Sequence, residues 1–155
     1  MKNKKELYLI AQNIRSLFNI GSIFRSADVF GVTKIYLCGY TAAPPNQKIE
    51  KVSLGAENFV PWEKHWQTHL LVSKLKSQGV KIYALETGPK TKNLTTFKPQ
   101  LPCALVVGNE VKGISRKILS QADAVISIPM LGQKESLNVA IAASIGLYEL
   151  GKYKQ

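Results

Sequence analysis

Residues 6–31, ELYLIAQNIRSLFNIGSIFRSADVFG, place a short apolar run directly before a longer amphipathic stretch. The run at 6–11 is too short for a helix and is typical of a buried strand. Apolar residues from Ile20 to Phe30 then recur at helical spacing, and Gly31 is placed to end that helix. A strand that leads directly into a helix is the repeating unit of an α/β fold.

The same alternation continues along the chain. Four further runs of strand length are KIYLC (34–38), VKIYAL (80–85), CALVVG (103–108) and AVISIP (124–129). Between and after them, the spacing predicts a helix that is marked by Trp66 to Leu75 and ends before Gly79, a short helix capped by Ser115, and a helix from Ser136 to about Leu150. The sequence therefore predicts an α/β domain whose largely parallel sheet is flanked by helices.

Two stretches, 39–48 and 86–99, are rich in Gly, Pro, Thr and Lys and are expected to be loops. Both follow strands, and ligands of open α/β sheets bind beyond the carboxyl ends of strands. A polyanion bound there is one interpretation, and an ordinary surface loop is the other. No linker or shift in composition divides the chain, so residues 1–155 are expected to form one domain without a separate RNA-binding domain.

The charge of the 155-residue chain is strongly basic. Lys and Arg number 21 against 10 Asp and Glu, which gives a formal net charge of +11. This balance favours a polyanionic partner, either nucleic acid or an anionic membrane, although surface lysines also serve solubility. Cys38 and Cys103 lie inside apolar runs, where a thiol behaves as a small buried hydrophobe. With no secretory signal or membrane span, we expect a cytoplasmic protein.

The first candidate site lies between the first strand and the first helix. Asn19 and Gly21 suit a tight loop at a helix start, where backbone N–H groups can face an anion. Arg25 follows about one turn later, and its fork of donors suits a phosphate. The alternative for Arg25 is a solvated helix face.

The second candidate site is GNEVKGIS (108–115), which follows the strand CALVV. It has the outline of a phosphate-binding P-loop, but Ile114 stands where the lysine is required, which disfavours nucleotide hydrolysis. No G-x-G-x-x-G follows a strand, so a dinucleotide site is disfavoured as well. A tight glycine turn at Gly108 still lets a flat ligand approach the backbone.

The third candidate site is IPMLGQKESLN (128–138), ahead of a helix rich in small residues. Ser136 is expected to cap that helix, with Asn138 in its first turn. The small residues between Ala140 and Gly146 permit close packing against another backbone, in the same chain or in a partner.

Two further patterns are weak. His65 and His69 have the i, i+4 spacing of zinc ligands on a helix, but no third ligand is evident, and surface or capping histidines are the expected outcome. Trp62 and Trp66 flank His65. They are expected to pack in the core, and a stacking platform for bases is the alternative.

Three ordered motifs give these sites a common context. N-x5-N-x-G-x3-R-x-A (about 13–28), LVVGNEVKGIS (105–115) and ISIPM…SLNVAIAAS (126–144) resemble the motifs of the SpoU (TrmH-type) RNA ribose 2′-O-methyltransferases of the SPOUT class. The resemblance extends over about residues 7–150. It implies an α/β knot, in which the C-terminal segment is threaded into a trefoil, with S-adenosylmethionine as cofactor and a homodimer formed through the knot region.

The resemblance also implies roles for particular residues. The catalytic set is Arg25, Asn19, Ser136 and Asn138, with Arg25 at the ribose and its phosphate. The cofactor-binding set, which includes the start of the 85–88 loop, is Leu85, Gly108, Glu110, Ile128, Met130 and Leu137. Glu110 is expected to brace the loops rather than to abstract a proton. No metal is implied, because a sulfonium methyl group is already activated.

The function implied by the resemblance is S-adenosylmethionine-dependent methylation of a ribose 2′-hydroxyl, with tRNA favoured as the substrate. The alternatives are rRNA 2′-O-methylation, a non-catalytic knotted RNA-binding protein, and a knotted methyltransferase for an RNA base. RNA would be held by the basic surface. The basic residues considered for this role are Lys2, Lys4, Lys5, Arg15, Lys48, Lys51, Lys112, Arg116 and Lys117.

Overall fold

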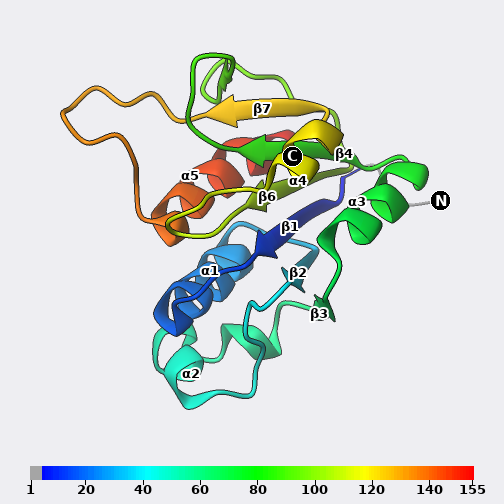
Figure 1. Cartoon of the computed structure of the whole chain (residues 1–155). Coiled ribbons are helices and arrows are strands. Elements are labelled where there is room, and N and C mark those ends of the chain that lie inside the picture. The colour runs from blue at the N-terminus through cyan, green and yellow to red at the C-terminus, as the bar shows by residue number, and fades with distance from the viewer. Residues whose placement is uncertain (1–4) are drawn as a thin grey trace.

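The computed structural model describes residues 5–155, which form one parallel sheet with helices on both faces (Figure 1). The strands are β1 (Leu7–Gln12), β2 (Lys34–Cys38), β3 (Trp62–His65), β4 (Lys81–Leu85), β5 (Lys92–Asn93), β6 (Cys103–Val107) and β7 (Ala124–Ser127). Their order in the sheet is β3-β2-β1-β6-β4-β7-β5, and every pairing is parallel. The predicted α/β class and the five predicted strands are confirmed, whereas the two edge strands, β3 and β5, were missed.

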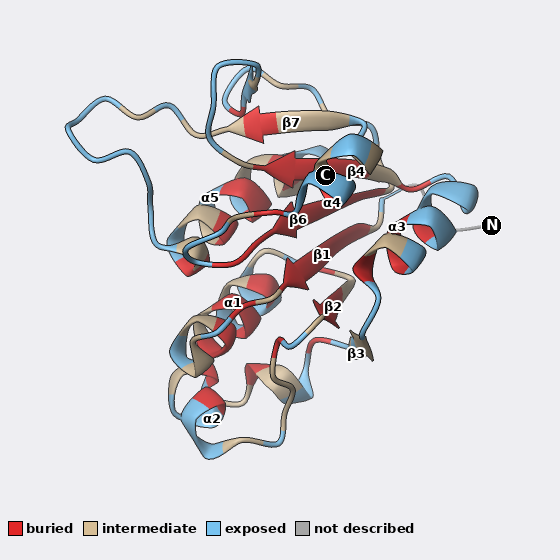
Figure 2. Ribbon diagram, in the orientation of Figure 1, coloured by how far each residue is buried: buried red, intermediate tan, exposed pale blue. Residues whose placement is uncertain are grey.

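The helices divide between the two faces of the sheet. They are α1 (Leu17–Val29), α2 (Gln47–Ser53), α3 (Thr68–Ser77), α4 (Arg116–Gln121) and α5 (Val139–Gly151), with short 3₁₀ turns at Ala56–Asn58 and Lys152–Lys154. Successive strand residues point to opposite faces. Leu7 and Leu9 accordingly pack with α1, α2 and α5, whereas Tyr8 and Ile10 pack with α3 and α4. Figure 2 shows the buried sheet between helices whose outer surfaces are exposed.

The central strands are buried along their length because helices cover both faces. All five residues of β6 are buried, which explains why CALVV is apolar throughout rather than alternating. Its pairing with β1 sets Leu7 opposite Cys103 and Ala11 opposite Val107. The loops that follow β1 and β6 therefore leave the sheet side by side, and these loops carry the first two sequence motifs.

The start of α1 differs from the prediction. Asn19 and Gly21 lie within the helix rather than in a loop, because Ser16 is the N-cap and its side chain accepts a hydrogen bond from the Asn19 N–H at 3.2 Å. Gly21 instead serves packing between helices. A Cβ atom at this position would lie 2.6 Å from the Ile49 carbonyl oxygen of α2. The predicted end of the helix is confirmed, since Gly31 has a φ of +68°.

The start of α5 also differs. Asn138 is the N-cap, and its Oδ1 accepts hydrogen bonds from the N–H groups of Ala140 at 2.9 Å and Ile141 at 3.2 Å. Ser136, the predicted cap, lies in the exposed segment 131–138. Asparagine is as good a cap as serine, and here it is the residue adjacent to the first helical turn. The trefoil knot stays a prediction.

Three smaller predictions also have clear outcomes. Ser115 occupies the N-cap position of α4, as predicted, but its side chain makes no capping hydrogen bond. The stretch predicted as a loop at 39–48 extends into α2, which Asn46 caps, because the side chain of Asn46 accepts the Lys48 N–H at 2.9 Å. Cys38 and Cys103 are buried as predicted, and burial raises the pKa of each thiol to about 12. None of the helices within 5–155 is long and apolar enough to cross a bilayer.

Candidate cofactor pocket and active site

A pocket of about 300 Å³ opens where β4, β6 and β7 end. The chain leaves these strands at Glu86, Gly108 and Ile128, and all three residues line the pocket. Ligands of parallel α/β sheets bind at such carboxyl ends. All six residues of the sequence-predicted cofactor set lie in its walls: Leu85, Gly108, Glu110, Ile128, Met130 and Leu137.

The glycine loop after β6 is held close to the end of β4. A Cβ atom at Gly108 would lie 2.5 Å from the Gly113 carbonyl carbon, so the two arms of the loop touch there. Glu86 fixes the far arm, because its Oε2 accepts the Ile114 N–H at 3.0 Å. Its Oε1 accepts the Thr87 N–H at 3.1 Å. Glu86 belongs to the 85–88 loop that was expected to line the pocket, but its role in fixing the glycine loop was not predicted, although a carboxylate directly after a buried strand was an available signal.

Asn109 is the buried centre of the same loop. Its Oδ1 accepts the N–H groups of Val111 at 2.9 Å and Lys112 at 2.8 Å. Its Nδ2 donates to the Asn13 carbonyl oxygen at 2.9 Å and to the Tyr40 hydroxyl at 2.7 Å. One side chain thus ties together the segments that follow β6, β1 and β2. Because both ends of this buried amide are satisfied, the loop is held in one shape.

Glu110 links the second motif to the first. Its carboxylate accepts the backbone N–H of Arg15 at 2.9 Å and of Ser16 at 2.8 Å, and the Asn19 side-chain amide at 3.2 Å. Partial burial raises the pKa of Glu110, but the hydrogen bonds from Arg15, Ser16 and Asn19 outweigh it and leave the pKa below its ordinary value. The expected bracing role of Glu110 agrees with these contacts.

Asn138 completes the connection from the third motif. Its Nδ2 donates to Asn19 Oδ1 at 3.0 Å, while its Oδ1 caps α5. Residues from all three motifs therefore form one chain of hydrogen bonds at the rim of the pocket, running from Glu110 through Asn19 to Asn138. Ser136 lies in the wall of the pocket.

Arg25 is not part of this arrangement. It lies on the exposed side of α1 and lines a separate hollow with Ser22, Ser26 and Val29. Its guanidinium makes no hydrogen bond or ion pair with any residue in 5–155. The structure therefore places Ser136 in the pocket wall and connects Asn19 and Asn138 to that wall through Glu110, while Arg25, the fourth predicted catalytic residue, lies outside the pocket.

The comparisons with known proteins agree with this geometry. The model of the SpoU rRNA methylase family matches residues 6–148, nearly the whole chain. The chain belongs to the SpoU methylase family. A tRNA (guanosine(18)-2′-O)-methyltransferase of Aquifex aeolicus is 34% identical over 155 residues, covering 99% of this chain and 72% of that one.

Other SpoU relatives are longer than this chain. The putative TrmH family tRNA/rRNA methyltransferase YacO of Bacillus subtilis is 28% identical over 96% of this chain, which spans 59% of its length. The crystal structure of the SpoU methyltransferase AviRb from Streptomyces viridochromogenes, in complex with AdoMet, has a TM-score of 0.89. It is 26% identical, and the match covers 98% of this chain and 62% of AviRb. The chain thus spans less than two thirds of these two SpoU proteins.

The basic residues predicted for RNA binding occupy several places on this SpoU domain. Arg15 and Lys112 line a hollow next to the cofactor pocket, and Lys117 lines another beside it. Lys48 and Lys51 lie on α2, and Arg116 begins α4. Lys5 is exposed near the start of β1, and Lys2 and Lys4 lie outside the described residues.

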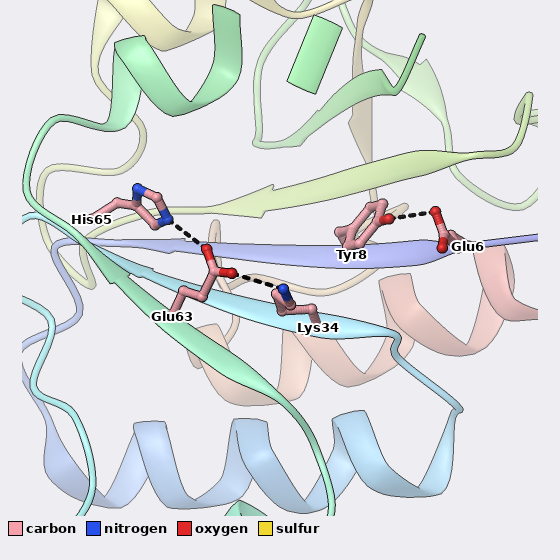
Figure 3. Close-up of polar contacts among 5 residues, drawn as sticks. All are labelled: Glu6, Tyr8, Lys34, Glu63 and His65. Atoms are coloured by element: carbon pink, nitrogen blue, oxygen red, sulfur yellow. Dashed lines mark hydrogen bonds and ion pairs between the residues drawn. The ribbon is translucent and has the colours of Figure 1, made fainter. Parts of the chain in front are cut away.

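The two histidines do not share a helix, which removes the basis of the weak zinc pattern. His65 ends β3, where its Nε2 lies 2.9 Å from Glu63 Oε2, and Glu63 is also paired with Lys34 at 2.7 Å (Figure 3). His69 lies in α3. Over 5–155, no cluster of three metal-ligating side chains is present. Trp62 packs against the core as expected, but the same prediction was wrong for Trp66, which is exposed because α3 begins only at Thr68.

Proposed function

We propose that this protein methylates a ribose 2′-hydroxyl of RNA with S-adenosylmethionine as the methyl donor. The observation that carries the proposal is a pocket walled by residues of the second and third motifs, to which Asn19 of the first motif is joined by the Glu110–Asn19–Asn138 hydrogen bonds. The relative from Aquifex aeolicus, named as a tRNA 2′-O-methyltransferase, supports the reaction. It also favours tRNA over rRNA as substrate, and such a substrate places the reaction in the cytoplasm.

The walls of the pocket suit this cofactor. Leu85, Ile128 and Leu137 offer apolar surface for a purine and a thioether chain, and the missing side chain at Gly108 leaves the backbone close to the cavity. We assign cofactor binding to these residues together with Met130, while Glu110 braces the loop. When bound, the cofactor supplies an electrophilic methyl group on sulfur.

The chain's own residues position the hydroxyl and stabilise the charge that develops on its oxygen. Arg25 binds the ribose and its phosphate and stabilises that negative charge. Its guanidinium stays protonated, so the proton of the hydroxyl passes to the phosphate or to water. Asn138 Nδ2 keeps one N–H beyond its bond to Asn19, and with the Ser136 hydroxyl it is available to orient the ribose.

A homodimer accounts for the separation between Arg25 and the pocket. Ile141, Ile145 and Tyr148 form an exposed apolar stripe on α5, with exposed fractions of 52%, 36% and 54%. The hydroxyls of Ser26 and Ser144 lie 2.6 Å apart, so the Arg25 side of α1 adjoins this stripe. We propose that two copies pair over this surface and that Arg25 of each serves the pocket of the other.

The test of the reaction uses purified protein, labelled S-adenosylmethionine, and unmodified tRNA or rRNA in separate reactions. Digestion to nucleosides followed by mass spectrometry is expected to give a 2′-O-methylated nucleoside from the tRNA pool. Methyl transfer to a base, or cofactor binding by calorimetry without transfer to either pool, would contradict the proposal.

The shared site has its own test. Arg25→Ala and Leu137→Lys are each expected to be inactive, the first because it lacks the charge-stabilising group and the second because it blocks the pocket. When the two variants are refolded together, random pairing makes half of the dimers mixed, and one of the two sites in each mixed dimer is intact. Activity is therefore expected to recover to about a quarter of the wild-type value. No recovery in the mixture would contradict sharing of the site between subunits.

A further inference from the structure

Trp66 is the first residue after β3, and 73% of its surface is exposed. Its ring is held in place, because Lys64 Nζ lies 4.5 Å from the ring centroid. The same ammonium donates to the carbonyl oxygens of Gly39, at 2.6 Å, and Thr41. The structure therefore presents a large exposed aromatic ring next to a cation that the neighbouring loop holds, and such a ring can stack on a flat ligand.

Two hollows meet at this ring. One of about 230 Å³ has the residues Asn13, Gly39, Trp66, His69, Ser115 and Lys117 in its walls. The other, of about 430 Å³, shares Trp66 with the first and adds Leu70 and Lys74. A flat ring shared by two hollows, one lined by Lys117 and the other by Lys74, suits a nucleobase whose flanking phosphates reach these two ammonium groups.

The hollows continue toward the cofactor pocket. A third hollow of about 480 Å³, lined by Arg15 and Tyr40, shares Asn109, Val111 and Lys112 with that pocket. Tyr40 follows Gly39 directly, which places the third hollow next to the Trp66 hollows. The three hollows succeed one another along the carboxyl ends of β6, β1, β2 and β3. These ends lie on one edge because the sheet is parallel.

The charges along this edge identify the kind of ligand. The charged side chains that line the three hollows are Arg15, Lys112, Lys117 and Lys74, with His65 and His69 beside them. Among the described residues, no carboxylate lines any of the three. A basic groove with an aromatic ring is the arrangement that binds single-stranded nucleic acid.

We propose that Trp66 stacks on a base of the substrate RNA, at a distance from the methylated ribose, and that single-stranded RNA lies along this edge. Three strand spacings separate β3 from β6, or roughly 14 Å. A stacked strand rises about 3.4 Å per nucleotide, so the base on Trp66 is about four nucleotides from the target. This position of the target rests on the proposed function.

The test measures binding of a fluorescently labelled 12-nucleotide single-stranded RNA of mixed sequence by anisotropy. Trp66→Ala is expected to weaken binding about tenfold, because one stacked base is lost, whereas Trp66→Phe keeps most of the affinity. The matched control is Phe59→Ala, since Phe59 is equally exposed at 74% but precedes the amino end of β3 and lines none of the three hollows. Its affinity is expected to stay within about twofold of wild type.

A second readout separates stacking from charge. In Trp62→Phe, where Trp66 is the remaining tryptophan, the RNA is expected to quench the fluorescence. Trp66→Ala is expected to leave the salt dependence of binding unchanged, whereas Lys117→Ala lowers its slope by about one. Equal affinities of wild type and Trp66→Ala, an equal loss in Phe59→Ala, or no binding of the 12-mer by wild type would overturn the proposal.

The two proposals can fail separately. Methyl transfer by wild type, with neither RNA affinity nor KM changed in Trp66→Ala, would reject the stacking site and keep the methyltransferase. RNA binding that depends on Trp66, without any methyl transfer, would reject the methyltransferase and keep the stacking site. Under both proposals, Trp66→Ala raises the KM for RNA and leaves cofactor affinity at the wild-type value.

Discussion

Asn19 at the pocket rim and Arg25 belong to the same helix, α1, yet their side chains are in opposite states. Asn19 at the rim is joined to Glu110 and Asn138, while Arg25 makes no hydrogen bond or ion pair within 5–155. The rim is thus pre-organised within one chain. Under the proposed function, the arginine serves groups that this chain does not itself supply, namely RNA and a second subunit.

The largest expected effect is a loss of activity on substitution of Arg25. Arg25→Ala is expected to lower the rate of methyl transfer about 10²–10³-fold, because it removes the group that stabilises the developing oxyanion. Since the side chain is exposed, stability should change by less than about 0.5 kcal/mol. Single-turnover transfer and calorimetric titration with S-adenosylmethionine measure the two quantities. Full activity in Arg25→Ala would remove the contrast between the two regions.

In contrast to Arg25→Ala, a substitution in the pocket wall is expected to lower the stability of the fold. Gly108→Ala forces a Cβ atom to 2.5 Å from the Gly113 backbone and is expected to cost about 1–3 kcal/mol, with loss of cofactor binding. Gly132→Ala is the control, because a Cβ atom there meets nothing within 4 Å. Chemical denaturation and calorimetry of both variants test this. Equal stabilities would show that the loop relaxes freely.

A smaller effect distinguishes the two residues of the third motif. Asn138→Ala removes the cap of α5 and the bond to Asn19, and is expected to cost about 1 kcal/mol of stability. Ser136→Ala is expected to stay within about 0.5 kcal/mol, since Ser136 is exposed and lies outside the helix. Thermal unfolding of the two variants measures the difference. A larger loss in Ser136→Ala would restore Ser136 as the cap.

The smallest effect is a dependence on pH. Hydrogen bonding in the folded protein lowers the pKa of Glu110, so its stabilisation is complete above the unfolded pKa and is lost as the pH falls through the folded pKa. Glu110→Gln is therefore expected to be less stable than wild type at about pH 7, by less than about 1 kcal/mol. Thermal midpoints measured down to about pH 3 should converge. A constant difference would assign the effect to packing rather than to charge.

Much of the fold followed from residue patterns. Apolar runs such as CALVV identified the buried strands because helices cover both of their faces. The edge strand β3 was missed because Trp62–His65 is only half-buried and carries Glu63 and Lys64, so its composition is not that of a strand. The start of α3 was predicted two residues too early, because Trp66 continues the helical spacing of Leu70, although it lies in a bend between β3 and α3.

The candidate site, like the fold, could be predicted only in part from the sequence. The family motifs identified the residues of the pocket, but no local pattern indicated which of them bond to one another. The bond from Asn138 to Asn19 joins residues 119 positions apart, and the Asn109 bonds join three loops. Such contacts depend on strand order, which the sequence spacing does not contain. The position of Arg25 outside the pocket has the same cause, since it depends on which side of α1 packs against α5.

The make-up of the pocket bears on how the protein is synthesised. Its walls come from residues 85–87, 107–113 and 128–142, and Leu147 and Leu150 share a core with Leu7 of the first strand. A nascent chain that has emerged only as far as β7 has most of the sheet but neither the last wall nor the helix that covers this core. Cofactor therefore cannot guide the early stages of co-translational folding. Of the edge that carries Trp66, strands β1, β2 and β3 are synthesised before any wall of the cofactor pocket.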